Sequence, residues 1–275
     1  MDAIEPGPVE TLTERDIAAG LALSDQAGWN QTAEDWALFL ARGTVLGRRA
    51  PAGDVIATAA VLPGGTTGWL SLVLTARAWR RRGLAAGLMR HCLQICERRH
   101  LEPWLDATPA GAQVYRPLGF VTVAGFTRLR RPANANTRAM PREPGDALDA
   151  LVALDRRALG FNRGALLRDH ARRSGSVVYG DARAACLVRA GRRARHIGPL
   201  HATSVAAALD LAGRVLDAEP GELICDLSDN HAALLDLLAA RGFVAERSFE
   251  RMRRGGGVAV GAPELLMASA GPEYG

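Results

Sequence analysis

The segment WRRRGLAAGLM, residues 79 to 89, has the composition of an anion-binding site. In the chemistry of such a site, backbone amides and arginines hold a phosphate group. The segment follows an apolar run, 69 to 75, and opens an amphipathic stretch, so it predicts a turn from a strand into a helix. The first amides of a helix lack internal partners and, with the helix dipole, favour an anion. Gly83 lets the backbone approach a ligand closely. We therefore predict a phosphate cradle formed by Arg80, Arg81, Arg82, Gly83, Leu84, Ala85 and Ala86.

The residue types that are missing narrow the choice of phosphate ligand. The chain has no lysine, so its 34 basic residues are all arginine. This argues against the Walker and kinase lysines and against Schiff-base enzymes. The glycine pattern of a dinucleotide fold, with its downstream acidic residue, is also missing. Another carrier of a pyrophosphate group fits the segment better.

Three motifs in order resemble the GNAT superfamily of N-acetyltransferases. The acetyl-CoA loop of that family reads R/Q-x-x-G-x-G/A, and Arg80, Gly83 and Ala85 match it. Upstream, the run WLSLVLT looks like the family's fourth strand. Downstream, LDATPAGAQVYRPLGF, residues 105 to 120, looks like the fifth strand, a short helix carrying a tyrosine and the Leu-Gly-Phe before the next strand. The order and spacing of the three motifs make the resemblance specific.

The resemblance implies that acetyl-CoA is the acyl donor and that the backbone of the fourth strand positions it. Backbone amides near Leu72, Val73 and Leu74 would hold the pantetheine arm and polarise the thioester carbonyl. Tyr115, in the position of the family's tyrosine, would protonate the departing sulfur. A phenol of pKa about 10 can protonate a thiolate only in a concerted, well-placed transfer. The alternative is that Tyr115 only packs beneath the donor.

A general base is harder to assign from the sequence. Many GNAT enzymes carry a glutamate on the fourth strand, whereas WLSLVLT offers only Ser71 and Thr75. Asp106, at the end of the predicted fifth strand, is our first candidate, followed by Asp35 and a chain of ordered waters. An aspartate of pKa about 3.9 is a poor base unless burial raises that pKa. Asp106 could equally fix the adjacent turn through Thr108.

The segment AGWNQTAEDW, residues 27 to 36, points to the acceptor. Thr32 reads as a helix N-cap, and the resemblance places the loop before this helix over the acceptor site. Trp29 and Asn30 are therefore expected to bind a small-molecule amine, although a tryptophan at such a junction can also be a packing anchor.

The two halves of the chain carry a repeated pattern. Gly-Phe-Val at 119 to 121 and again at 242 to 244 is followed at identical spacings by a phenylalanine and three arginines. Each block follows an apolar helix and reads as a closing strand, which indicates a duplicated αβ unit. Between the copies, RRPANANTRAMPREPGD has the composition of a linker.

We therefore expect an α/β fold of tandem GNAT-like domains, each a central twisted mixed sheet flanked by helices. The first, 1–131, is predicted to be the catalytic acetyl-CoA-binding domain, and 132–146 the linker. The second, 147–275, is predicted to be degenerate, because its equivalent turn, GPLHATSVAA, lacks the motif's arginine and glycine. It would complete the substrate pocket rather than perform chemistry.

Composition gives further expectations. A net charge of +5 arises from 34 basic and 29 acidic residues, without a basic block. No signal pattern and no apolar run of roughly 18 residues is present, so we expect a cytoplasmic protein without a membrane partner. No metal is expected, because the cysteines lack paired metal-ligand spacing: Cys92, Cys96, Cys186 and Cys225.

We predict an acetyl-CoA-dependent N-acetyltransferase that acts on the amine of a small molecule or amino-acid-like acceptor, by direct attack in a ternary complex. An alternative is a non-catalytic acyl-CoA-binding regulatory protein, which would account for the missing glutamate. A third reading takes the arginine-rich ranges 80–82, 128–131 and 251–254 as a nucleic-acid surface. No aromatic-rich binding motif accompanies them, so we expect no nucleic-acid partner. The sequence leaves monomer and homodimer open.

Overall fold

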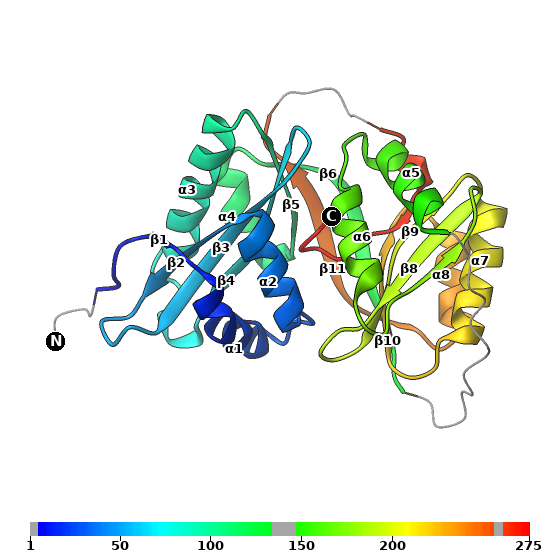
Figure 1. Ribbon diagram of the computed structural model, residues 1–275, viewed down its shortest axis with the longest axis horizontal. Helices are drawn as coiled ribbons and strands as arrows, with labels where there is room; N and C mark the ends of the chain where they lie inside the picture. Colours follow the sequence, from blue (N-terminus) through cyan, green and yellow to red (C-terminus); the bar gives the residue numbers. More distant parts are fainter. Residues whose placement is uncertain (1–4, 134–146, 256–260) are drawn as a thin grey trace. The chain divides into compact units, whose positions relative to one another are not determined.

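The computed structural model describes residues 5 to 133, 147 to 255 and 261 to 275 (Figure 1). The chain divides into two compact units. Unit 1 comprises Met1–Leu105, Gly111–Val121 and Arg253–Gly255, and unit 2 comprises Asp106–Ala110, Thr122–Met252 and Gly256–Gly275. The predicted linker, 132–146, lies outside the described residues from residue 134 onward.

The first part of the chain forms helices and strands in alternation. The helices are α1 (Ile17–Ala27), α2 (Ala33–Arg42), α3 (Leu84–Arg98) and α4 (Pro109–Tyr115). The strands are β1 (Glu10–Thr11), β2 (Thr44–Arg49), β3 (Val55–Gly64), β4 (Thr67–Thr75) and β5 (Glu102–Ala107). Strands β1 to β4 pair antiparallel in chain order, and β5 then pairs parallel with β4.

Strand β3 lies at the centre of the unit 1 core. Its residues from Val55 to Leu62 are all buried, without the alternation of a strand that has one wet face. The strand contacts α1, α2 and α3, which cover the sheet. Helix α3 buries one apolar stripe, as its four-residue spacing predicts, with Leu88, Met89 and Cys92 fully enclosed.

The second part of the chain repeats this order of elements. The helices are α5 (Ala147–Leu159), α6 (Gly164–Arg172), α7 (Val205–Ala218) and α8 (Ala232–Ala240). The strands are β6 (Val121–Arg131), β7 (Val177–Gly180), β8 (Ala184–Arg189), β9 (Arg195–Ala202), β10 (Leu223–Ser228), β11 (Val244–Arg253) and β12 (Leu266–Ala268). In unit 2 the strand order is β11-β6-β10-β12-β9-β8-β7, and β10 also pairs parallel with β9.

Helices cover both faces of the unit 2 sheet. On β8, Ala184, Cys186 and Val188 pack in one core cluster with residues of α7 and α8. Ala185 and Leu187, which point to the opposite face, pack with residues of α5 and α6. Each half thus contains two helices, three antiparallel strands, a helix and a parallel strand, which is the tandem architecture that the sequence predicts.

The pairing of strand β6 differs from our expectation. We predicted that it would close the sheet of a first domain ending at residue 131, but β6 pairs antiparallel with β10, and Thr122 onward groups with unit 2. A buried ion pair favours this placement. Arg128 on β6 donates to both carboxylate oxygens of Asp226 on β10, at 2.7 and 2.8 Å. A strand's own sequence specifies its faces but not its neighbours.

Candidate functional site

The start of helix α3 has the geometry of an anion cradle. Gly83 is its N-cap, with φ of +75°, and no side chain caps the helix. The first intrahelical bond runs from Gly87 N to Gly83 O, so the amides of Leu84, Ala85 and Ala86 precede the hydrogen-bond ladder. Arg81 adopts a left-handed backbone with φ of +61°, which a non-glycine residue rarely adopts. The loop is therefore held in a specific shape in front of unpaired amides.

The three arginines of the loop differ in their contacts. Arg80 donates from Nε to the Thr75 carbonyl at 3.1 Å, and the guanidinium of Arg82 lies 4.7 Å from the ring centroid of Trp79. Within the described residues, Arg81 makes no hydrogen bond or ion pair, and its side chain is exposed. Arg80 and Arg82 thus brace the loop, and Arg81 is available to a ligand.

Strand β4 carries a β-bulge beside the cradle. Thr58 and Ala60 on β3 pair with Leu74 and Ser71, so one residue of β3 faces two residues of β4, Leu72 and Val73. Leu72 has a φ of +50°, and its carbonyl accepts a 2.7 Å hydrogen bond from the fully buried hydroxyl of Thr58. The bulge turns the backbone of residues 72 and 73 out of the ladder with β3.

Strands β4 and β5 separate next to this bulge. Their parallel pairing joins Thr67–Trp69 to Glu102–Trp104 and extends no further among the described residues. The main chain of β4 from Ser71 to Leu74 therefore lacks a strand partner on its β5 side within the described structure. Predicted donor-binding residues Leu72, Val73 and Leu74 all lie on this stretch.

These features fit a coenzyme A molecule. A Cβ built on Gly83 or on Gly87 meets no atom within 4 Å, so the space in front of the cradle is open to a pyrophosphate. The amides of the first helical turn supply donors, and Arg81 supplies charge. The separated edge of β4 could accept an extended amide chain, because no strand pairs with it on the β5 side within the described residues.

Tyr115 ends helix α4 and is buried, with 8 % of its surface exposed. Its ring packs 6.1 Å from that of Phe120, and within the described residues its hydroxyl makes no hydrogen bond. Burial raises the pKa of Tyr115 well above its usual value, and the nearby Cys92 raises it further. The phenol therefore stays protonated at neutral pH and keeps a proton to donate.

Asp106 is not an available base in this structure. Both of its carboxylate oxygens accept hydrogen bonds from Arg251, at 2.8 and 2.9 Å, and both side chains are nearly inaccessible. A guanidinium fork that occupies both oxygens of the carboxylate leaves neither oxygen directed at an acceptor amine. Asp35, the second candidate, is fully buried and serves in a capping box, where its Oδ2 accepts from Thr32 N at 2.8 Å.

The loop between α1 and α2 carries the predicted acceptor residues. Trp29 is half-buried, and its amide donates to the Ser24 carbonyl at 2.9 Å. Asn30 and Gln31 are buried, and the Gln31 Oε1 has no hydrogen-bond partner among the described residues. Thr32 caps α2, as the sequence predicts, through a 3.2 Å bond from Asp35 N. The loop is thus held by its own hydrogen bonds. The Oε1 atom of Gln31 is a hydrogen-bond acceptor in this loop that we did not predict.

Two further polar residues of the β3–β4 pair were not among the predicted site residues. Thr58 holds the bulge, and Ser71, which is 7 % exposed, has an Oγ without a hydrogen-bond partner in the described structure. Each is a hydroxyl residue between two apolar neighbours, which was the available signal. The pairing that places Thr58 opposite the bulge could not be inferred from sequence.

The equivalent turn of unit 2 differs from the cradle. Helix α7 is capped by Ser204, whose hydroxyl accepts from Ala207 N at 3.2 Å, so one amide that an anion would bind is already used. The strand before it, β9, contains Pro199, which has no N–H. These features agree with the predicted loss of the phosphate cradle in the second half.

No group of three or more His, Cys, Asp and Glu side chains in ranges 5–133, 147–255 and 261–275 could hold a metal ion. No helix in those ranges has both the length and the apolar character needed to cross a membrane.

Two family models match the chain, one in each half. A model described as "Acetyltransferase (GNAT) family" matches residues 16–120, and one described as "Acetyltransferase (GNAT) domain" matches residues 151–263. Comparison with curated proteins finds no match.

Solved structures share the complete two-unit fold. A Pyrococcus horikoshii protein assigned as an acetyltransferase superposes with a TM-score of 0.80 at 19% identity, over 98% of this chain and 95% of its own. A tandem GNAT protein from the clavulanic acid biosynthesis pathway gives 0.64 at 15% identity, over 91% and 99%. A GCN5-related N-acetyltransferase from Sphaerobacter thermophilus gives 0.63 at 16% identity, over 92% and 98%. Because both halves match the family, the chain belongs to the GNAT family of acetyltransferases, as a two-domain member of a family that transfers acyl groups from acetyl-CoA.

Proposed function

We propose that unit 1 is an N-acetyltransferase that moves the acetyl group of acetyl-CoA to the amine of a small-molecule or amino-acid-like acceptor. The observation that carries the proposal is the uncapped start of α3 behind Gly83, with Arg81 exposed beside it and the bulged edge of β4 alongside. This arrangement supports binding of a pyrophosphate and an extended amide chain to one unit. The amide cradle would be formed by Arg80, Arg81, Arg82, Gly83, Leu84, Ala85 and Ala86.

In this reaction the amine nitrogen forms a bond to the thioester carbon and the carbon–sulfur bond breaks. Backbone amides at Leu72 to Leu74 would donate to the carbonyl oxygen, where negative charge develops. Tyr115, kept protonated by burial, would transfer its proton to the departing thiolate. Trp29 and Asn30 would orient the acceptor so that its nitrogen meets the carbonyl carbon.

The amine must also lose a proton. Asp106 is engaged by Arg251, and β4 carries no carboxylate or imidazole, its hydroxyl groups being those of Thr67, Ser71 and Thr75. We therefore propose that the acceptor enters as the neutral amine and that the proton lost after attack passes to solvent. The fraction of neutral acceptor, rather than an enzyme carboxylate, would then govern the rate.

Charge reversal in the cradle tests donor binding. Replacing Arg81→Glu places a negative charge where the pyrophosphate is expected, and we predict that Kd for coenzyme A rises about tenfold, corresponding to about 1.4 kcal/mol. The measurement is titration calorimetry with coenzyme A. Arg90→Glu is the matched control, because Arg90 is exposed on α3, beyond the loop that holds Arg81, and the net charge changes equally. Equal affinities of both variants and the wild type would contradict the cradle.

One observation favours the second candidate, a non-catalytic acyl-CoA-binding regulatory protein. Among the described residues, β4 carries no carboxylate and Asp106 is tied into an ion pair. Thiol release from acetyl-CoA with a library of amines separates the two functions. Acceptor-dependent release supports the enzyme, whereas coenzyme A binding without release by any amine supports the regulatory protein.

A further inference from the structure

Both units have the same backbone irregularity at the strand that precedes the third helix. In unit 1, Thr58 and Ala60 of β3 face Leu74 and Ser71 of β4, which leaves one extra residue on β4. In unit 2, Cys186 and Val188 of β8 face Leu200 and Ile197 of β9, which leaves one extra residue on β9. The next strand pairs parallel over three residues in each case. The two units therefore have equivalent places at which an extended ligand could lie between separating strands.

In unit 2 this place is filled by the chain itself. Strand β12 pairs antiparallel with β9, through Leu266 opposite His201 and Ala268 opposite Leu200. The same strand pairs with β10, through Ala268 opposite Leu227. Just beyond it, Ser269 N donates to the Asp226 carbonyl at 2.9 Å. Backbone groups of β9 and β10 that a ligand would need are thus already paired.

Residues 266 to 275, which we call the plug segment, lie deep in unit 2. All are buried except Pro272, which is half-buried. Arg189, itself buried, donates to the Ala270 carbonyl at 2.9 Å and forms an ion pair with Glu273 at 3.2 Å. These buried charged contacts are lost together if the plug segment leaves, so displacement of the segment by a ligand has a high cost in free energy.

A second buried arginine holds the far end of the plug segment. Arg163 donates to the carbonyl oxygens of Tyr274, at 2.5 Å, and of Gly275. Its guanidinium is oriented by the buried carboxylate of Asp155, which also contacts His201 of β9 at 2.8 Å. The network therefore ties the plug segment to the same strand that it covers.

The contact between the plug segment and the bulge of β9 is close. Gly198 has a φ of +149°, and a Cβ there would lie 2.0 Å from the Ser269 carbonyl oxygen. Only glycine admits this approach. The neighbouring Pro199 supplies no amide to a ligand.

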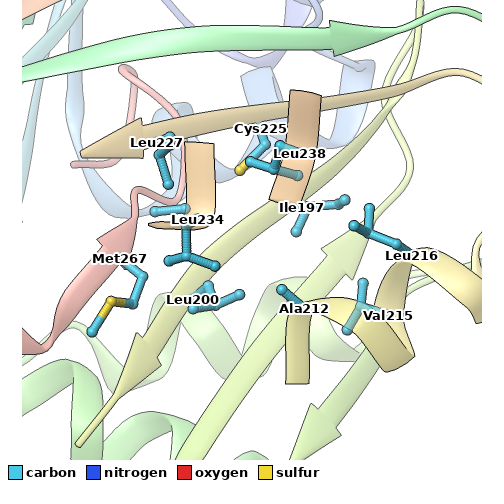
Figure 2. Close-up of a pocket in the computed structure, with 11 residues that line it drawn as sticks. Ile197, Leu200, Ala212, Val215, Leu216, Cys225, Leu227, Leu234, Leu238 and Met267 are labelled. Atoms are coloured by element: carbon cyan, nitrogen blue, oxygen red, sulfur yellow. The ribbon is translucent and has the colours of Figure 1, made fainter. Parts of the chain in front are cut away.

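The core of unit 2 holds an apolar cavity of about 20 Å³, at which Met267 of the plug segment lies among Leu200 of β9 and Leu234 of α8 (Figure 2). A cavity of roughly 10 to 15 Å³ is needed for a single water. The GNAT family match of this half ends at residue 263, so the plug segment lies beyond the matched core.

We infer that residues 266–275 are an internal plug that occupies the cofactor cleft of unit 2, so that each chain binds one coenzyme A, in unit 1. The statement about unit 1 rests on the proposed function. The plug itself rests only on contacts within unit 2.

Hydrogen exchange on the full chain, with and without coenzyme A, tests the plug. Amides 267 to 270 should exchange slowly without the ligand and should not change when coenzyme A is added, whereas amides 84 to 86 should become protected. Calorimetry should give one coenzyme A per chain. Fast exchange at 267 to 270, loss of protection there on adding coenzyme A, or two molecules bound per chain would overturn the plug.

Gly198→Ala provides a matched perturbation. The added methyl group collides with Ser269, so we expect amide exchange at 267 to 270 to accelerate at least tenfold while Kd for coenzyme A is unchanged. Gly213→Ala on α7, where a Cβ meets no atom within 4 Å, should leave exchange unaltered. Unaltered exchange in Gly198→Ala would contradict the inferred contact. Slow exchange at 267 to 270 with no coenzyme A binding at all would contradict the proposed function of unit 1 and still support the plug.

Discussion

The burial of Tyr115 determines the pH range over which its phenol holds a proton. Burial raises the pKa of the phenol above its ordinary value of about 10, so the protonated form prevails across the neutral range. The phenol of Tyr115 therefore has a proton to donate at any pH below about 10, and it loses that proton only as the pH rises through the raised pKa.

We predict that Tyr115→Phe lowers kcat roughly a hundredfold, within the usual range for loss of a general acid, while KM for acetyl-CoA changes little. The hydroxyl has no hydrogen-bond partner in the described structure, so the fold should tolerate its loss. Thiol release provides the measurement. Tyr179→Phe is the control, since it removes a buried 2.6 Å bond to Glu219 and should lower thermal stability without altering kcat. An unchanged kcat in Tyr115→Phe would leave this residue a packing role only.

The ion pair of Asp106 with Arg251 leads to a prediction about pH. If no enzyme carboxylate accepts the proton, kcat/KM should rise with pH in proportion to the neutral fraction of the acceptor, up to the acceptor's own pKa. Two acceptors whose pKa values differ by about two units should therefore give inflections that differ by about two units. An inflection at the same pH for both acceptors would identify an enzyme group as the base.

At the scale of elements, the bulge of β4 depends on one buried hydrogen bond. Thr58→Val keeps the volume of the side chain but leaves the Leu72 carbonyl without its donor, which should cost about 1–3 kcal/mol in the free energy of unfolding. We also expect kcat/KM to fall, because the backbone at residues 72 and 73 is no longer held. Urea unfolding and steady-state kinetics measure the two effects.

Thr44→Val, at the start of β2, is a suitable control for that substitution. Thr44 is half-buried, and its side chain makes no hydrogen bond within the described residues. Thr44→Val should change neither the free energy of unfolding nor kcat/KM appreciably. If Thr58→Val behaved in the same way, the bulge would be maintained by the backbone and the packing around it alone.

At the scale of the whole molecule, buried charges in unit 2 link stability to pH. Burial lowers the pKa of His196, and its contact with Asp226 only partly offsets this, so the folded state favours the neutral imidazole. This contribution is complete above the unfolded pKa of about 6.5 and is lost as the pH falls below it. Burial raises the pKa of Asp226, but Arg128 outweighs burial and leaves it well below its usual range. That contribution persists above about pH 4 and is lost only in stronger acid.

We therefore predict that acid destabilises the protein in two stages, the first as the pH falls below about 6.5. His196→Asn should reduce the loss of stability in the first stage, as measured by urea midpoints at a series of pH values. His91→Asn, at an exposed position of α3, should retain the wild-type slope. A first stage that persists in His196→Asn would assign it to another group.

Much of the candidate site was predictable because it depends on neighbours in the chain. The start of α3 follows from Gly83 and the four-residue apolar spacing, and the cap at Thr32 follows from Asp35 three residues later. The position of Tyr115 at the end of a short helix was likewise readable from one motif. The ion pair of Asp106 was not predictable, because its partner Arg251 lies 145 residues away in sequence.

The sequence by itself determined the duplicated order of elements and the start of α3 behind Gly83, since helix periodicity, glycine conformation and turn chemistry act over a few residues. Only the tertiary structure decided that β6 pairs with β10, that Thr58 supports the bulge of β4, and that residues 266–275 fill the cleft of unit 2. These outcomes depend on which strands meet and on which buried charges are paired. Both are set by burial and long-range pairing that no local pattern encodes.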